Sequence, residues 1–188
     1  RSSSDPPYDG NPSWSPDGNT LAFASNRDGN WEIYTIAANG TSSTRLTSND
    51  TLEMSPCWSP NGQRVAFWSF RNDVADIFLM NVDGTGQVNL TNNPGWDFDP
   101  AWSPDGASIA FQSDRDGNGE IYVVDMATGE QTRLTDNEFF DGSPAWSPDG
   151  QKILFHSDRD EIGRDGNFEI YVMNADGSNQ INVSNNSA

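Results

Sequence analysis

Trp102-Ser-Pro-Asp-Gly106 is the stretch that decides the fold, because the chain contains this pattern four times. The other copies begin at Trp14, Trp58 and Trp146, and the copy at Trp58 differs only in carrying Asn61 in place of Asp. Successive tryptophans of the pattern are 44 residues apart. A fixed period of this length indicates a repeat architecture in which each repeat is one supersecondary unit.

The third repeat shows how one unit is built. We expect four short strands separated by turns rich in Gly, Asp and Asn. These strands cover residues 99–103, 108–112, 120–124 and 131–135. The other repeats follow the same order, and the fourth has five additional residues, around 161–165, between its second and third strands. An insertion confined to a turn is what a repeat fold tolerates.

Four-stranded units of this length are stable when they are arranged as blades around an axis, where neighbouring blades cover one another's faces. The sequence therefore predicts an all-β fold, a β-propeller of four four-stranded blades in a single domain over residues 1–188. The blades are expected at about 8–47, 52–91, 96–135 and 140–184. Three arrangements stay open. They are a closed four-bladed ring, an eight-bladed ring completed by two chains, and an end-to-end fibre formed through outer strand edges such as residues 180–184.

Longer parts of the repeat resemble a known family. Residues 100–135 contain Pro-x-Trp-Ser-Pro-Asp-Gly, then Ile-Ala-Phe-x-Ser-Asp-Arg-Asp-Gly-Asn-x-Glu-Ile-Tyr, then Arg-Leu-Thr. These motifs are similar to the WD40-like (PD40) repeat of TolB-type propellers. The second repeat departs most, at Asn61 and over residues 72–75. The resemblance implies a propeller fold and an exported, non-catalytic binding module.

The charge of the chain limits its partners. It carries 28 acidic and 10 basic residues, a net charge of −18. Such a chain repels nucleic acid and anionic membrane surfaces, which bind proteins through basic contacts. It favours metal cations or basic patches on other proteins. No apolar run approaches 18 residues, so the sequence predicts no membrane insertion.

Several features bear on location. The chain begins with Arg1 and has no signal peptide, so we expect a mature form or a segment of a longer protein. Lys152 is the only lysine and Cys57 the only cysteine, which fits a secreted, periplasmic or cell-surface protein. Cys57 takes a position that small residues such as Ala101 and Ala145 fill in other repeats, so we expect it to be a small buried apolar group.

An acidic residue stands five positions before each repeated tryptophan. These residues are Asp9, Glu53, Asp97 and Asp141. Because the first strand of a blade is innermost in a propeller, we expect the four carboxylates to form a ring near one mouth of the central channel. Clustered carboxylate oxygens are the ligands that Ca²⁺ prefers, so this ring is the candidate metal site. The alternative is that each acid accepts hydrogen bonds from backbone amides at a blade junction.

The connections between the second and third strands offer a second calcium candidate. In the third repeat Asp114, Asp116, Asn118 and Glu120 alternate along the chain. However, Asp-Gly-Asn is common in tight turns, and the distal bidentate Glu of an EF-hand is missing. An arginine also recurs in this connection, as Arg27, Arg71, Arg115 and Arg159. We therefore predict a hairpin, with the arginine as a salt-bridge partner within its own blade.

Catalysis finds little support in the sequence. His156 is the only histidine, so a Ser-His-Asp triad and a multi-histidine metal centre lack their usual residues. We expect His156 to be a packed or half-exposed strand residue. We therefore predict that the protein is not an enzyme and has no catalytic residues, and that it binds a protein partner or copies of itself. The alternative is a carbohydrate-binding or carbohydrate-active propeller that uses the acids of the channel. Glycans would then be partners, with Trp31, Trp96 and Phe168 as sugar platforms.

Overall fold

The computed structural model describes residues 6–71, 73–159 and 168–185. Within these ranges every regular element is a β-strand, and the strands form four four-stranded sheets. This confirms the prediction of an all-β fold built from four-stranded blades. The additional residues of the fourth repeat, 161–165, lie outside the described ranges. In the described part of the chain, no helix has the length and apolar character needed to cross a membrane.

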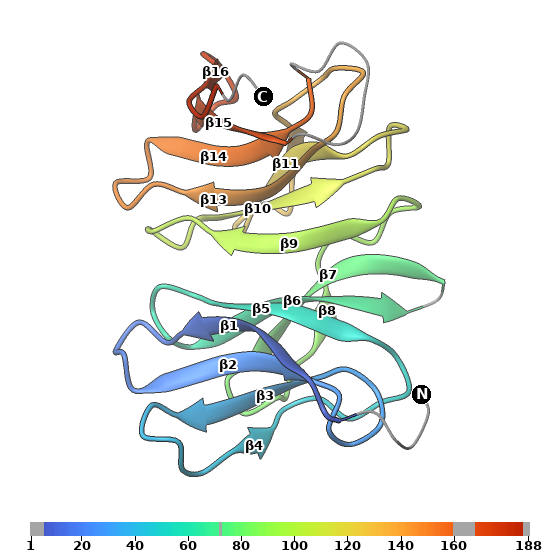
Figure 1. Ribbon diagram of the computed structural model, residues 1–188, viewed down its shortest axis with the longest axis vertical. Helices are drawn as coiled ribbons and strands as arrows, with labels where there is room; N and C mark the ends of the chain where they lie inside the picture. The colour runs from blue at the N-terminus through green and yellow to red at the C-terminus, as the bar shows by residue number, and fades with distance from the viewer. Residues whose placement is uncertain (1–5, 72, 160–167, 186–188) are drawn as a thin grey trace. The chain divides into compact units, whose positions relative to one another are not determined.

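Each blade consists of four consecutive strands (Figure 1). Blade 1 contains β1 (Asp9–Trp14), β2 (Thr20–Ser25), β3 (Glu32–Ala37) and β4 (Thr44–Arg45). Blade 2 contains β5 (Glu53–Trp58), β6 (Arg64–Arg71), β7 (Val74–Asn81) and β8 (Val88–Asn89). Blade 3 contains β9 (Asp97–Trp102), β10 (Ser108–Ser113), β11 (Glu120–Asp125) and β12 (Gln131–Arg133). Blade 4 contains β13 (Asp141–Trp146), β14 (Lys152–Ser157), β15 (Glu169–Asn174) and β16 (Ile181–Asn182).

The strands of each blade pair in chain order, and every pairing is antiparallel. The two central strands of blade 3, β10 and β11, pair without interruption from Ser108 opposite Asp125 to Ser113 opposite Glu120. Alternate side chains along a strand point to opposite faces. Ile109 is therefore on the same face as Phe111, and both are fully buried.

The repeated Trp-Ser-Pro-Asp-Gly pattern forms the hairpin loop between the first two strands of a blade. In blade 3 the amide of Gly106 donates to the carbonyl of Ser103 at 2.9 Å, and Gly106 has a φ of 72°. The Ser103 hydroxyl donates to Asp105 at 2.6 Å, and Asp105 also accepts from the amide of Ala107 at 2.9 Å. The motif recurs because each of its polar side chains closes part of the same turn.

A β-bulge interrupts the first strand of every blade. The pairing of β9 with β10 shifts register between Phe98 and Ala101, and Asp99 lies there with a φ of 51°. The same left-handed conformation recurs at the equivalent residues Asn11, Ser55 and Ser143. A proline follows each of them. A bulge bends the strand and turns the neighbouring side chains, so each first strand changes direction at one fixed place.

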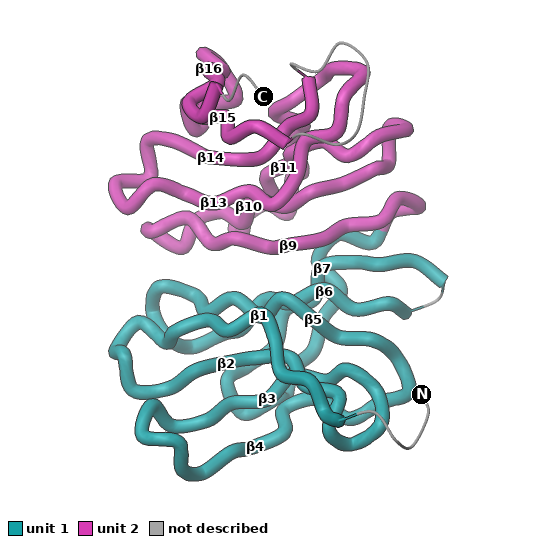
Figure 2. The backbone as a smooth tube through the Cα atoms, in the orientation of Figure 1, with its two compact units in different colours: residues 1–92 teal, residues 93–188 magenta. Residues whose placement is uncertain are grey.

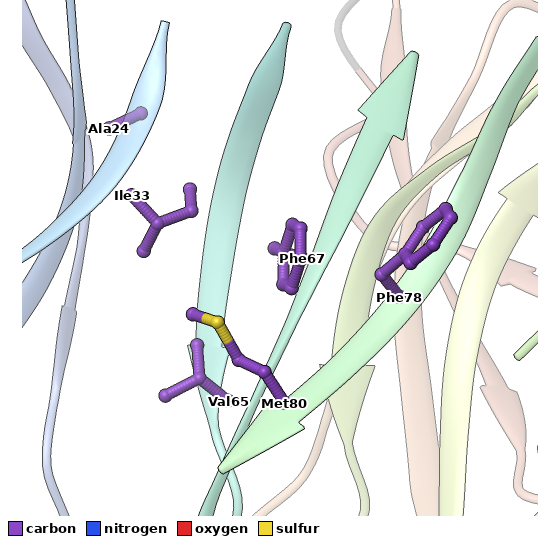
Figure 3. Packing of buried hydrophobic residues seen from close by; sticks show 6 residues of the cluster. All are labelled: Ala24, Ile33, Val65, Phe67, Phe78 and Met80. Atoms are coloured by element: carbon purple, nitrogen blue, oxygen red, sulfur yellow. The ribbon is translucent and has the colours of Figure 1, made fainter. Parts of the chain in front are cut away.

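The chain divides into two compact units, residues 1–92 and 93–188 (Figure 2). Each unit is a pair of blades packed face to face around its own hydrophobic cluster. In unit 1, Ala24 and Ile33 of blade 1 meet Val65, Phe67 and Met80 of blade 2 (Figure 3). Unit 2 packs in the same way, with Ala110 and Ile121 of blade 3 against Ile153, Phe155, Tyr171 and Met173 of blade 4. All but Ala110 are at positions equivalent to the cluster residues of unit 1, and Ala110 corresponds to Ala22 of blade 1.

The two units also correspond to a second repeat, twice as long as the blade. Blades 2 and 4 share Ser-Pro-x-Trp-Ser-Pro-x-Gly-Gln at residues 55–63 and 143–151. They also share Met-Asn-x-Asp-Gly at residues 80–84 and 173–177. Blades 1 and 3 instead share Thr-Arg-Leu-Thr at residues 44–47 and 132–135. The chain therefore alternates between two kinds of blade, and each unit contains one of each kind.

Candidate functional site: an acid and an arginine in every blade

Each of the four recurrent acids forms an ion pair with the recurrent arginine of its own blade. The acid is the first residue of the first strand. The arginine belongs to the hairpin between the second and third strands, except in blade 2, where Arg71 is the last residue of β6. The pairs are Asp9 with Arg27 at 2.9 Å, Glu53 with Arg71, Asp97 with Arg115 at 3.2 Å, and Asp141 with Arg159 at 2.6 Å. This confirms the prediction that the arginines are salt-bridge partners within the blade.

The first pair differs from the other three in its exposure. The side chains of Glu53, Asp97 and Asp141 have no exposed surface, whereas that of Asp9 is 55% exposed. A buried carboxylate is strongly destabilising unless it is paired and hydrogen-bonded. Three of the arginines therefore compensate a buried charge. Burial raises the pKa of Asp9, but hydrogen bonds from Ser25 and Arg27 outweigh it and leave that pKa lowered.

Two further contacts hold each guanidinium in place. In blade 3 the Nε of Arg115 donates to the Ser113 hydroxyl at 2.8 Å, and the guanidinium lies 4.3 Å from the centre of the Tyr122 ring. In blade 4 Arg159 makes the same contacts with Ser157 at 2.9 Å and with Tyr171 at 4.5 Å. A planar guanidinium can stack on a ring and bridge a carboxylate at the same time, which a lysine cannot do.

An asparagine on the connection between two blades reaches the same carboxylate. Its Nδ2 donates to the acid four residues later, at 2.6 Å from Asn49 to Glu53, 2.5 Å from Asn93 to Asp97 and 2.7 Å from Asn137 to Asp141. Side chains therefore donate the hydrogen bonds that hold these acids, whereas the alternative interpretation expected backbone amides. The contact also fixes the path of the chain as it enters a new blade.

Blades 1 and 3 carry a second buried acid with its own arginine. Glu32 pairs with Arg45 at 2.7 Å, and Glu120 pairs with Arg133 at 2.8 Å. In blade 2 the corresponding acid is Asp76, and the Nδ2 of Asn89 donates to it at 2.8 Å. The ion pair at the outer strand therefore belongs to one of the two kinds of blade.

The four acids that were predicted to bind a metal ion are the acids that pair with the recurrent arginines. Among the described residues, no group of three or more His, Cys, Asp or Glu side chains is arranged to hold a metal ion. Unit 1 contributes two of the four acids of the predicted ring and unit 2 the other two. The calcium site formed by Asp9, Glu53, Asp97 and Asp141 therefore stays a prediction, and any cation there would compete with four guanidinium groups for the carboxylates.

The connections between the second and third strands are hairpins whose polar groups already have partners. In blade 1 the Tyr34 hydroxyl donates to Asp28 at 2.5 Å, and Arg45 lies 3.6 Å from the same carboxylate. Burial and the hydrogen bond to Asp28 raise the pKa of Tyr34 to about 12. In blade 3, Tyr122 and Arg133 contact Asp116 in the same way. These contacts support the hairpin interpretation over a calcium loop.

The single histidine and the single cysteine both lie in strands. His156 in β14 stacks on Phe140, with ring centres 5.5 Å apart, and meets the edge of Phe168 at 4.7 Å. Burial lowers its pKa, although Asp99, Asp141 and Asp158 act in the opposite direction. His156 is thus a packed strand residue, as expected. Cys57 in β5 is half-buried, not buried as the sequence predicted.

The residue directly before each recurrent acid is apolar and, in three blades, exposed. We call this the pre-acid position, and its members are Tyr8, Leu52, Trp96 and Phe140. The first three are 65%, 42% and 45% exposed. The hairpin fixes the backbone here, because the amide of Trp96 donates to Asp114 at 2.6 Å and that of Phe140 to Asp158 at 2.8 Å. Each unit therefore presents large apolar side chains beside its ion pairs.

Sequence reasoning missed several members of this network. The serine that ends the second strand, as in Ser113, and the asparagine four residues before the acid, as in Asn93, were not singled out. Both recur at fixed positions, so aligning the four repeats would have found them. The second ion pair was missed because Arg45 and Arg133 recur only in alternate blades.

Comparison with known proteins identifies the family. The family model of the TolB β-propeller domain (PD40) matches residues 46–188. The structure of TolB from Agrobacterium tumefaciens is 32% identical with a TM-score of 0.81, over 90% of this chain and 62% of that one. TolB from Acinetobacter baumannii is 28% identical with a TM-score of 0.80, over 94% of this chain and 43% of that one. The chain thus spans less than two thirds of the length of either structure.

A more distant likeness concerns the fold alone. An oligogalacturonate lyase in complex with manganese is 18% identical with a TM-score of 0.68, over 90% of this chain and 50% of that one. No curated protein matches the sequence. The family match covers most of the chain and includes three of the four acid–arginine pairs. The chain belongs to the TolB β-propeller family.

Proposed function

We propose that this chain is a non-enzymatic module that binds protein partners and assembles with other copies, and that it works outside the cytoplasm. The observation that carries the proposal is the exposure of Tyr8, Leu52 and Trp96 at one repeated position. Large exposed apolar groups set among polar residues are typical of protein-interaction sites. Aromatic residues are also the commonest anchors of such interfaces.

Charge defines the kind of partner. Exposed acids lie close to the pre-acid position, with Asp50 two residues before Leu52 and Glu138 two residues before Phe140. The whole chain has a net charge of −18. The partner we propose therefore presents apolar side chains next to Lys or Arg, because opposite charges steer the encounter and discriminate against other proteins.

The proposal that the chain is not an enzyme is supported by the state of its acids. Glycoside chemistry needs two carboxylates that can exchange protons or attack a sugar. Glu53, Asp97 and Asp141 are buried and ion-paired with arginine. The carbohydrate-active alternative would require these pairs to break. Sugar binding on exposed aromatics such as Trp96 stays the second candidate, and Phe168 is also 48% exposed.

The location is inferred from the family and the composition. Its TolB relatives, the single lysine and the single cysteine favour a secreted, periplasmic or cell-surface module. Calcium is a candidate ligand of the four acids, but it would have to compete with the arginines for their carboxylates. Fibre formation would follow if copies join head to tail without closing a ring.

A displayed library of random peptides tests the proposed binding site. We expect the library to yield peptides with basic and aromatic residues, and their affinity to fall at least tenfold on the Trp96→Ala variant. Val82→Ala is the control, because Val82 is an exposed apolar residue in the β7–β8 turn, away from the pre-acid position. Selected peptides that bind Trp96→Ala as well as wild type would refute the site. A glycan array on which only wild type binds would favour the second candidate.

A further inference from the structure

A pocket of about 380 Å³ opens between the two blades of unit 2. The first hairpin of blade 3 and the turn before the last strand of blade 4 form most of its wall. Its volume is in the range of small-ligand pockets, roughly 300–1,000 Å³. The side chains that give it its chemistry are Asp105, Asp176, Trp146 and Val123.

This pocket lies at the opposite end of the blades from the pre-acid position. In blade 4 the pre-acid residue Phe140 directly precedes β13, whereas Trp146 is the last residue of β13. A strand of six residues spans about 20 Å. In Figure 1 the arrowheads of β9 and β13, where the first hairpins begin, point to the same side of unit 2. A ligand in the pocket therefore leaves the pre-acid position free.

Two carboxylates line the pocket, and each uses only one of its oxygens within the chain. Oδ1 of Asp105 accepts from the Ser103 hydroxyl at 2.6 Å and from the Ala107 amide at 2.9 Å. Oδ1 of Asp176 accepts from the hydroxyl and the amide of Ser178, at 2.6 Å and 2.9 Å. These hydrogen bonds lower the pKa of both acids, so both are charged at neutral pH. Within the described ranges Oδ2 of each acid accepts no hydrogen bond, which leaves it for a ligand.

The chain supplies no cation to these two acids. In the part of the chain that the structure describes, neither Asp105 nor Asp176 forms an ion pair, and no basic residue lines the pocket. Lys152, the only lysine, donates to Asn174 at 3.3 Å. The recurrent acids of the blades differ in this respect, because each of them pairs with an arginine. The pocket therefore has a negative charge that no residue of the chain compensates.

The aromatic wall of the pocket is held in a fixed position. Trp146 is half-buried and packs against the hydrophobic cluster of unit 2. Its Nε1 donates to the Ala101 carbonyl of the preceding blade at 3.2 Å. Because the polar atom of the indole already has this partner, the ring contributes apolar surface to the pocket. An aromatic face attracts cations, and a guanidinium stacks on it well.

Each blade shows which cation a carboxylate and an aromatic ring hold together. In blade 3 the guanidinium of Arg115 lies 4.3 Å from the centre of the Tyr122 ring and pairs with Asp97 at 3.2 Å. The planar guanidinium presents its N–H donors in a rigid fork while one face rests on the ring, whereas the ammonium of a lysine is a compact point charge. The pocket has the ring and the carboxylates of this arrangement but lacks its guanidinium.

We propose that this pocket binds the guanidinium group of an arginine side chain on a partner protein. The group stacks on Trp146 and donates to Oδ2 of Asp105 and of Asp176. Hydrogen bonds between a guanidinium and carboxylates are charge-assisted and specific in geometry. The net charge of −18 attracts a basic partner to the chain, and the pocket selects arginine from its cations. This site goes beyond the binding proposed for the pre-acid position and does not depend on it.

The repeats of the chain supply a variant that should fold. Asn61 stands at the position of Asp105 in blade 2 and accepts the same two hydrogen bonds in its turn, at 2.8 Å and 3.0 Å. Asn39 stands at the position of Asp176 in blade 1 and accepts a hydrogen bond from an amide of its turn at 3.1 Å. Asp105→Asn combined with Asp176→Asn therefore removes both charges from the pocket and keeps both turns.

The matched control places the same two changes in the same two kinds of turn, with the blades exchanged. It combines Asp149→Asn, in the first hairpin of blade 4, with Asp125→Asn, in the turn before the last strand of blade 3. Neither residue lines the pocket. The probes are the capped tripeptides Gly-Arg-Gly and Gly-Lys-Gly, which have equal charge. Nuclear magnetic resonance titration at physiological salt follows backbone amide and indole signals, because salt screens the general attraction of the chain for cations.

We expect Gly-Arg-Gly to shift the indole signal of Trp146 and the amide signals of Ala107 and Ser178 in wild type and in the control. Its affinity should be at least fivefold higher than that of Gly-Lys-Gly, and should fall at least fivefold when the two acids of the pocket are replaced. Equal affinity for the two peptides overturns the proposal, as does an equal loss in the control or a titration without these shifts. Trp96→Ala should not change this affinity, so a failure here is distinct from a failure of the pre-acid site.

Discussion

Gly177 lies directly against Leu134: a Cβ on Gly177 would stand 2.7 Å from the Leu134 carbonyl oxygen. Gly177 belongs to the turn before the last strand of blade 4, and Leu134 follows the last strand of blade 3. Gly84 and Leu46 repeat the relationship in unit 1. Within each unit, the second blade therefore approaches the backbone of the first so closely that only glycine fits.

This relationship predicts the effect of a methyl group. Gly177→Ala should destabilise the protein more than Gly40→Ala, although both glycines have a similar φ, 85° and 81°. The left-handed conformation costs alanine about 1–2 kcal/mol at either place. The collision with Leu134 should add about 1–3 kcal/mol at Gly177 alone. Chemical denaturation measures the free energy of unfolding of both variants. Equal losses of stability would show that the turn at Gly177 moves to accommodate the methyl group, so that the close approach to Leu134 does not matter.

The ion pairs predict a contrast between blades. Arg115→Met leaves the buried carboxylate of Asp97 without its countercharge, which should cost about 3–5 kcal/mol. Arg27→Met is the control, because Arg27 stacks on a tyrosine as Arg115 does but pairs with the exposed Asp9. An exposed pair contributes only about 0–1 kcal/mol. A loss of stability for Arg115→Met no greater than for Arg27→Met, measured by urea unfolding, would mean that burial of Asp97 does not matter.

His156 predicts a dependence of stability on pH. Burial lowers its pKa in the folded chain, so the unfolded chain binds the proton more readily. Stability should therefore fall as the pH drops below about 6.5, the ordinary pKa of histidine, by at most ~1.4 kcal/mol per pH unit. His156→Gln introduces the residue that blade 3 has at Gln112 and should flatten the profile between pH 6.5 and 5. An identical profile in the variant would exclude the histidine as the cause.

The carboxylates predict how the protein responds to calcium. A ring of free acids would bind Ca²⁺ and raise the melting temperature, and Asp97→Asn combined with Asp141→Asn would remove that gain. Because arginines already pair with these acids, we expect the wild-type melting temperature to be unchanged by millimolar Ca²⁺. Differential scanning calorimetry decides the matter. A rise that the double substitution abolishes would establish the calcium site.

The blade was predictable because its signals are local and repeat four times. Turn residues such as Gly106 and alternating pairs such as Ile109 and Phe111 placed the strands of blade 3 nearly at their observed ends. The first strand was predicted to begin at residue 99, but it begins at Asp97. Acidic residues are common in turns, and only the structure shows that Asp97 is a strand residue paired with Arg115. The arginine of the hairpin was correctly predicted to be a salt-bridge partner, because its positive charge would repel a metal cation held by the same acids.

The pairing of blades could not be predicted from one repeat. It depends on backbone approaches such as that of Gly84 to Leu46, which join positions far apart in the chain. The sequence signals the pairing only through one alternating position. This position is arginine in blades 1 and 3 (Arg45, Arg133) and asparagine in blades 2 and 4 (Asn89, Asn182), so it is recognised only when each blade is compared with the next but one. The burial of the acids could not be predicted from the sequence either, because a charge is buried only where the packing of the fold supplies a partner.

Peptide binding to wild type and to Trp96→Ala tests the central claim, that the exposed apolar residues of the pre-acid position bind protein partners. Titration calorimetry at low salt, where the attraction between a basic peptide and a chain of charge −18 is least screened, gives the most direct answer. The account predicts an affinity that falls at least tenfold on the variant and that weakens for wild type as salt is added. Equal affinity for wild type and variant would contradict it.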